Sequence, residues 1–276
     1  MTTIQSERPT LAPASLARAS LAITWRNLIH IKRMPEMLLD VTVQSVMFVL
    51  LFAYVFGGAI NAPGGADYKE FLLPGIMVQT MIFSSATVAI GLTSDMQKGI
   101  VDRFKSLPIS RSSVLVGRSI SSLIHASIGI VVMGVTGLLI GWRIREGLVD
   151  ALLAVGLLLL FGFAMIWLGI WVGSMMRTVE SVQGLMFTVM FPLTFVANTF
   201  VPSQSMPNWL QPIAEWNPVS ALTQACRELW GNGPAASGDA SWALHHPVLM
   251  SAVWSIGLAA IFAPLALAAF RRRSRD

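Results

Sequence analysis

Side chains that could do acid, base or metal chemistry are few in this chain and lie far apart. The four histidines show no metal-ligand spacing, and the single cysteine, Cys226, can form no disulfide within the chain. The sequence has neither the G-x-S-x-G turn of a serine hydrolase nor the G-x-x-x-x-G-K-[ST] loop that binds nucleotide phosphates. We therefore expect no enzymatic activity and no metal or cofactor bound by this chain.

One polar constellation does lie inside an apolar segment. Arg118, Ser122, His125 and Gly129 follow one another at the spacing of a helix face. Ionisable groups within a membrane are costly and usually functional, so His125 is a candidate for a transport path. The alternative is a face of small and hydroxyl residues that packs against another helix, with Arg118 reaching toward water near a cytoplasmic end.

The segment 181–201 carries the second group of candidates. Soft thioethers and aromatic rings suit a cavity for variable apolar cargo. The residues of this kind are Met186, Phe187, Met190, Phe191 and Phe195. Lipid-facing or packed side chains are the alternative. We take His125, Met186, Met190, Phe191 and Phe195 as the candidate transport path.

The composition shows what must position these residues. Of 276 residues, 54% are hydrophobic and 12% charged, and the mean hydropathy is +0.66. A helix that crosses a hydrocarbon core about 30 Å thick needs roughly 20 apolar residues. Six segments are long and apolar enough, namely 38–57, 72–94, 113–141, 148–174, 181–201 and 248–270. We therefore expect an all-α integral membrane protein with six transmembrane helices.

The basic residues predict the orientation. If the first helix enters from the cytoplasm, 15 of the 19 lysines and arginines lie inside and four lie outside. The four outside are Lys69, Arg143, Arg145 and Arg227. Because lysine and arginine accumulate in cytoplasmic loops, both termini are predicted to be cytoplasmic. This placement also explains the net charge of +5, so we expect membrane lipids and no nucleic acid as partners.

Two segments flank the membrane on the predicted cytoplasmic side. In residues 16–34, Leu21 and Trp25 share one helical face and Arg26 lies on the other, which is typical of a helix at the membrane surface; a cytoplasmic extension of the first span is the alternative. Residues 97–106 are also amphipathic. Their apolar face is formed with Met96, Ile100, Phe104 and Leu107, and a basic loop that only fixes topology is the alternative.

The segment 202–230 is too polar to span, but it is rich in tryptophan and in helical spacings such as Val219, Leu222, Cys226 and Leu229. We expect two short helices at the outer interface. A loop, "GNGPAASGD", follows.

Three stretches resemble the ABC-2 type membrane subunits of ABC transporters, in particular the branch that includes daunorubicin and doxorubicin exporters. They are "LPISRSSVLVGRSIS" at 107–121, "FVPSQSMPNWLQPIAEWNPVSALTQACREL" at 200–229 and the N-terminal interfacial helix. The resemblance covers nearly the whole chain. It implies a bacterial plasma-membrane subunit that pairs with a second copy of itself or a related permease, and with two copies of a separate ATPase subunit. ATP and magnesium would bind in that partner.

The resemblance also assigns residues 97–106 as a cytoplasmic coupling helix that docks on the ATPase, and residues 203–230 as outer re-entrant helices. The docking residues would be Lys98, Ile100, Asp102, Arg103, Phe104 and Lys105. The layout is then a cytoplasmic N-terminus with an interfacial helix at 1–36, a six-helix transmembrane domain of the ABC-2 permease type at 37–270, and a basic cytoplasmic tail at 271–276.

Together these features predict the membrane subunit of an ATP-driven exporter that moves an amphipathic small molecule, such as a drug or antibiotic, out of the cell. Two alternatives stay open. One is export of a lipid or a lipid-linked glycan, and the other is a membrane scaffold or channel that transports nothing with ATP.

Overall fold

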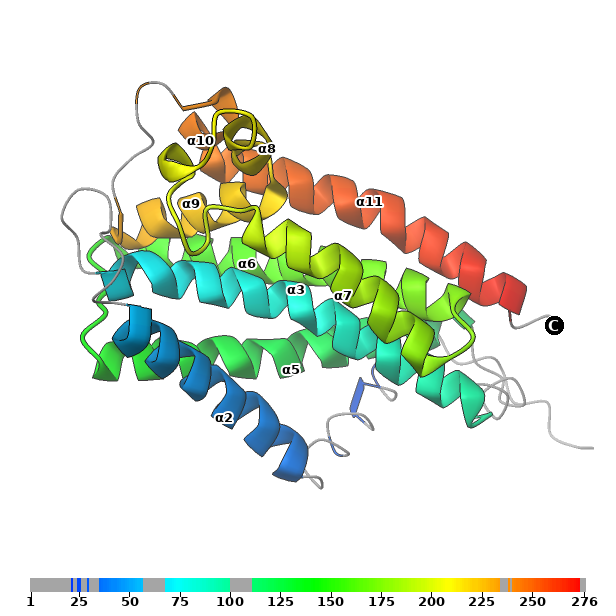
Figure 1. Ribbon diagram of the computed structural model, residues 1–276. Coiled ribbons are helices and arrows are strands. Elements are labelled where there is room, and N and C mark those ends of the chain that lie inside the picture. The colour runs from blue at the N-terminus through cyan, green and yellow to red at the C-terminus, as the bar shows by residue number, and fades with distance from the viewer. Residues whose placement is uncertain are drawn as a thin grey trace, which may run out of the picture.

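The computed structural model describes residues 21, 24–25, 29, 35–56, 68–99, 111–233, 238 and 240–273 (Figure 1). This part of the chain is helical and contains no strand. The long helices are α2 (Pro35–Leu51), α3 (Tyr68–Gln97), α5 (Arg111–Leu139), α6 (Leu148–Met175), α7 (Val179–Phe195) and α11 (Pro247–Arg273). The short elements are the π-helical η1 (Phe52–Phe56), the 3-10 turn η3 (Ser203–Ser205), α8 (Gln211–Glu215), α9 (Pro218–Trp230) and α10 (Trp242–His245).

A helix lies at each of the six predicted spans, but the helices differ in length. Four of them, α3, α5, α6 and α11, are long and apolar enough to cross a membrane. The helices α2 and α7 have 17 residues each, and η1 continues α2. The class predicted from sequence, an all-α membrane protein, is therefore confirmed.

Helix α7 is shorter than the predicted segment 181–201, because it ends at Phe195. The last carbonyl groups of a helix have no N–H within the helix to accept from. Here the Leu193 carbonyl accepts a hydrogen bond of 2.8 Å from Nδ2 of Asn217, which begins α9. A side chain from a distant segment thus caps α7 and allows the chain to turn into η3.

The helices α3 and α6 form the centre of the bundle and touch through their backbones. A β-carbon added at Gly169 would lie 2.2 Å from the Ser85 carbonyl oxygen, and one at Gly173 would lie 2.7 Å from that of Ala89. Only glycine leaves room for such an approach, which is a common way for membrane helices to gain packing contacts. Around this pair, α11 packs on α6, α7 packs on α3, and α5 packs on both (Figure 1).

The outer faces of the peripheral helices are apolar. Exposed side chains of this kind include Met47 on α2, Val131 on α5 and Ile256 on α11. Inside the bundle the helices share one continuous hydrophobic core that also includes α9. Apolar side chains on both the inner and the outer faces are what a bundle in lipid requires.

The short helices gather at the end of the bundle where α3 begins (Figure 1). We call this the capped end. Two short helices lie in 202–230, α8 and α9, as predicted. The amphipathic pattern predicted for α9 is not what the structure shows, because the helix is buried on nearly all sides, polar residues such as Thr223 and Gln224 included, whereas Leu229 is only half-buried. Exposed tryptophans, Trp209, Trp216 and Trp242, surround α8 and α10. Tryptophan favours the level of the lipid headgroups.

The flanking segments are described only in part. Leu21, Thr24, Trp25 and Ile29 are helical, and Leu21 and Trp25 are both exposed, as the amphipathic pattern predicts. The Thr24 hydroxyl donates to the Gly117 carbonyl of α5 at 3.1 Å, which holds this helix against the bundle. The rest of residues 1–34 and residues 100–110 lie outside the described part, and α11 includes the first three residues of the predicted tail.

The α3–α6 contact generates the first prediction. Replacing Gly169 with alanine should force the two backbones apart, at a cost of about 1–3 kcal/mol, which is usual for overpacking. The measurement is thermal unfolding of the purified protein in detergent. The control is Gly156→Ala on the same helix, where the added β-carbon meets no atom within 4 Å. Equal melting temperatures for the two variants would contradict the close contact.

Candidate functional site

Seven phenylalanine rings form a continuous row along one side of the bundle. In order they are Phe48, Phe52, Phe200, Phe195, Phe191, Phe187 and Phe83. Centroids of contacting rings lie 4.8 to 6.3 Å apart, within or near the range of favourable aromatic pairs. We call this set the aromatic row. It connects α2 and η1 to α7 and to α3 beneath it.

The aromatic row is open on its outer side. Phe191 and Phe195, both predicted transport-path residues, are 46% and 54% exposed, and Phe187 between Phe83 and Phe191 is 44% exposed. Such a surface offers large apolar area and no formal charge, so it suits aromatic or aliphatic groups of many shapes.

The other predicted path residues lie elsewhere. Met186 and Met190 are both 1% exposed, and the Met190 sulfur lies 3.9 Å from the Ser85 hydroxyl of α3. They therefore pack α7 onto α3 in this structure. His125 lies half-buried on α5, which packs mainly against α2, α3 and α6. The structure thus keeps Phe191 and Phe195 together, and places His125 on a helix that packs mainly on other helices than α7.

A buried arginine organises the capped end. Arg227 on α9 is 1% exposed. Its Nε donates to the Phe71 carbonyl at 2.9 Å, and its Nη2 donates to the carbonyls of Asn198 and Thr199 at 2.9 and 3.0 Å. The guanidinium also lies 3.5 Å from the centroid of the Phe71 ring. One side chain thereby joins α9, the start of α3 and the turn that follows α7.

No carboxylate pairs with Arg227 in the described part of the chain. Burial lowers the pKa of the Arg227 guanidinium to about 9, which leaves it charged at neutral pH. The charge is balanced by the dipoles of the three carbonyl groups. Asn198 and Thr199 come shortly after the carboxyl end of α7, where the helix dipole is negative. Since a buried cation must be hydrogen-bonded to be tolerated, these three carbonyls fix the position of α9.

Further polar contacts surround Arg227. Arg145 donates to the buried carboxylate of Glu70 at 2.6 Å, which ties the α5–α6 connection to α3. The Trp142 Nε1 donates to the Asn232 side chain at 2.8 Å, and Asn232 donates in turn to the Arg143 carbonyl. The capped end is therefore one hydrogen-bonded unit.

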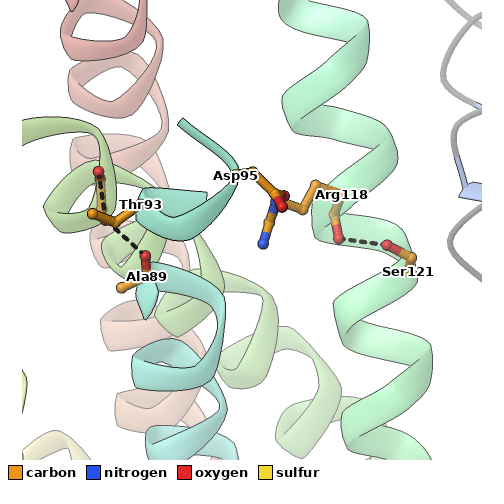
Figure 2. Close-up of polar contacts among 6 residues, drawn as sticks. Ala89, Thr93, Asp95, Arg118 and Ser121 are labelled. Carbon is orange, nitrogen blue, oxygen red and sulfur yellow. Dashed lines mark hydrogen bonds and ion pairs between the residues drawn. The ribbon is translucent and has the colours of Figure 1, made fainter. Parts of the chain in front are cut away.

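The opposite end carries an ion pair between Asp95 of α3 and Arg118 of α5 (Figure 2). The sequence led us to expect that Arg118 reaches toward water near a helix end. Instead, its guanidinium points across to α3 and pairs with the Asp95 carboxylate. On α3, Thr93 donates to the carbonyls of Ala89 and, across the helix contact, Gly173 of α6, both at 3.0 Å.

The predicted coupling segment begins directly beyond this ion pair. Gln97 ends α3, and Lys98 is exposed in the turn that follows. Gly99 has a φ of +67°, so the chain leaves α3 through a left-handed residue that favours glycine. The remaining predicted docking residues, Ile100, Asp102, Arg103, Phe104 and Lys105, lie outside the described residues.

The described residues hold no group of three or more histidine, cysteine, aspartate or glutamate side chains placed to bind a metal. The site therefore consists of an open apolar surface between two polar ends. Such an arrangement can hold an apolar group, and the charged groups Arg227, Arg118 and Asp95 at its two ends are engaged in structural contacts.

Sequence reasoning missed two parts of this arrangement. The spacings Phe48–Phe52 and Phe187–Phe191–Phe195 are each four residues apart and could have indicated the aromatic row, whereas Phe83 and Phe200 join it only through the fold. Arg227 was assigned to an exposed outer segment. Its burial has no local signal, because all three carbonyls lie far away in the sequence.

Comparison with known proteins identifies the family. The family model for ABC-2 type transporters matches residues 18–229. The chain belongs to the ABC-2 type transporter family. One relative is the daunorubicin resistance ABC transporter permease protein DrrB1 of Streptomyces coeruleorubidus. The two sequences are 33% identical over 97% of this chain and 90% of DrrB1.

Two more distant members agree with this assignment. The probable doxorubicin resistance ABC transporter permease protein DrrC of Mycobacterium tuberculosis is 27% identical over 84% of this chain and 80% of its own. The probable multidrug ABC transporter permease YbhR of Escherichia coli is 22% identical over 75% of this chain and 54% of its own. The resemblance to ABC-2 type membrane subunits that was drawn from the sequence is thus confirmed. The family match includes the capped end as far as Leu229, so Arg227 lies within the shared region.

The contacts of Arg227 give the second prediction. Arg227→Met should remove three hydrogen bonds to buried carbonyls, at about 1–3 kcal/mol for each, so the variant should unfold at a clearly lower temperature in detergent. The unfolding temperature of Arg227→Lys should lie between those of the wild type and Arg227→Met, because an ammonium group cannot reproduce the planar fork of donors of a guanidinium.

The control is Arg143→Met at the same end. Arg143 is exposed and also donates to backbone carbonyls, those of Leu138 and Trp142. Water can replace it there, so this variant should lose no more than about 1 kcal/mol. A loss for Arg143→Met as large as that for Arg227→Met would show that burial is not the cause.

Proposed function

We propose that this chain is the membrane-spanning subunit of an ATP-driven exporter of amphipathic drugs or antibiotics. The observation that carries the proposal is the match to a daunorubicin resistance permease over 97% of the chain, together with the family match. The aromatic row supports it, because an open surface of rings suits flat, partly apolar molecules. Export differs from the action of a scaffold or channel in requiring ATP hydrolysis.

The proposed energy source is a separate ATPase. The chain has no phosphate-binding loop of its own, so two copies of a partner subunit would bind ATP and magnesium. The membrane half would contain two copies of this chain or one copy with a related permease. Nucleotide binding and hydrolysis would shift the two halves between conformations.

The proposed topology has six spans and two cytoplasmic termini in a bacterial plasma membrane. The 15 to 4 distribution of basic residues supports the orientation. The helix α2 continued by η1 has 22 residues, which is enough to cross a bilayer. The helix α7 has 17 residues, and a bilayer that thins slightly around it would allow it to cross as well. The capped end would then lie outside, with its exposed tryptophans at the headgroup level.

The topology gives the third prediction. A cysteine at Gly238, introduced in a Cys226→Ala background, should react with a membrane-impermeant thiol reagent in intact cells, since Gly238 is exposed at the capped end. A cysteine at Lys98, which is exposed at the other end, should react only after permeabilisation. The opposite pattern would reverse the orientation.

The fourth prediction tests the function itself. Cells that express the chain with the ATPase encoded beside it should export daunorubicin, and the chain alone should neither export nor hydrolyse ATP. Ile100→Asp with Phe104→Asp should abolish export at normal abundance of the chain, because each change places a charge at a proposed apolar contact. Ile100→Leu with Phe104→Leu keeps the contact apolar and serves as the matched control.

Two outcomes would contradict the proposal. Hydrolysis of ATP by a preparation free of the partner would overturn the division between subunits. Normal export by the double aspartate variant would show that residues 97–106 set topology without docking.

A further inference from the structure

The Asp95–Arg118 ion pair joins two helices that are consecutive in the described part of the chain. Asp95 lies two residues before the end of α3, and Arg118 lies in the second turn of α5. Between these helices the chain runs through residues 98–110, which contain most of the segment proposed to dock on the ATPase. The ion pair therefore joins the two helices at the base of that segment (Figure 2).

The fold provides a fitted position for the arginine. A β-carbon at Gly91 would lie 2.5 Å from the Arg118 Nη2, so the guanidinium rests in a gap on α3 one turn before Asp95. The side chains of Arg118 and Asp95 are 20% and 36% exposed. Partial burial reduces screening by water and salt, so such a pair is stronger than an ion pair on an open surface.

On its other side, α3 is held by hydrogen bonds from uncharged side chains. The Thr93 hydroxyl donates to the Gly173 carbonyl of α6 at 3.0 Å. The Gln97 side chain donates to the Arg177 carbonyl beyond α6 at 3.1 Å. The last turns of α3 are thus held by the ion pair to α5 and by separate hydrogen bonds to α6 and to the residue that follows it.

We propose that Asp95 and Arg118 are positioning residues that make α3 and α5 move as one unit when the partner ATPase acts on the segment between them. The inference rests on the proposed function. The segment is joined to both helices, and the ion pair links them directly where it begins and ends. With the pair broken, α3 and α5 would be free to shift relative to one another, so less of the movement driven by hydrolysis would reach α5.

The first experiment needs no partner. In a Cys226→Ala background, spin labels can be placed at Lys98, where residues 98–110 begin, and at Ser112, just after they end. The distribution of distances between the two labels should be narrow in the purified full chain. Asp95→Asn should broaden or shift it, and the exchanged pair Asp95→Arg with Arg118→Asp should narrow it again. An unchanged distribution in Asp95→Asn would overturn the inference, whatever the chain transports.

The second experiment uses the assembled complex. Asp95→Asn and Arg118→Gln should still bind the ATPase and hydrolyse ATP, but daunorubicin exported per ATP should fall roughly tenfold, within the usual range of coupling between sites. The exchanged pair should recover most of that loss. Wild-type coupling in both single variants would overturn the inference while leaving the proposed function in place.

Gly91→Ala displaces the guanidinium without changing any charge, so it should uncouple in the same way if the single charge variants fail to fold. Gly184→Ala, where the added β-carbon meets no atom within 4 Å, is its control. Normal coupling in folded Gly91→Ala would count against the inference. A wild-type complex that neither exports nor hydrolyses would instead refute the proposed function, and the spin-label result would still decide the role of the ion pair.

Discussion

The absence of water in a hydrocarbon core is the constraint on which this structure depends. A polar group that is shielded from water, by lipid or by other side chains, is tolerated only when it finds a partner within the protein. Arg227 shows the constraint most clearly, because its buried guanidinium is satisfied by three carbonyls from two segments far away in the sequence. That arrangement determines where α9 lies and how the start of α3 and the turn after α7 are held.

The same constraint explains why α3 is the central helix. Arg227 and Arg145 hold its first turns, backbone contact with α6 at Gly169 holds its middle, and Asp95 and Thr93 hold its last turns. The two polar ends differ in character. The capped end depends on a fully buried cation whose removal strands several acceptors, whereas the Asp95–Arg118 pair is partly exposed and can open at lower cost. The buried arginine therefore suits a fixed support for α9, and the partly exposed pair suits a direct link between α3 and α5.

Helix existence could be predicted from the sequence, because hydropathy over about 20 residues reports directly on burial in lipid. The exposure of Leu21 and Trp25 also follows from local spacing, whereas the burial of nearly all of α9 does not. The end of α7 could not be predicted, since it depends on Asn217 capping Leu193 across 24 residues. Of the candidate path residues, Phe191 and Phe195 proved exposed and Met186 and Met190 buried, a distinction that depends on which face of α7 meets α3.

Charged residues were the hardest to place, for a physical reason. Their number on each side of the membrane predicts orientation, but their individual positions depend on partners that sequence alone does not reveal. Arg118 could have reached for water and is paired with Asp95, while Arg227 was placed only in a short helix at the outer interface and is buried. In a bilayer an arginine has two ways to lower its energy, which are to reach water or to find acceptors inside the protein. Where the fold provides Gly91 beside Asp95, or three carbonyls around one point, the second way becomes available.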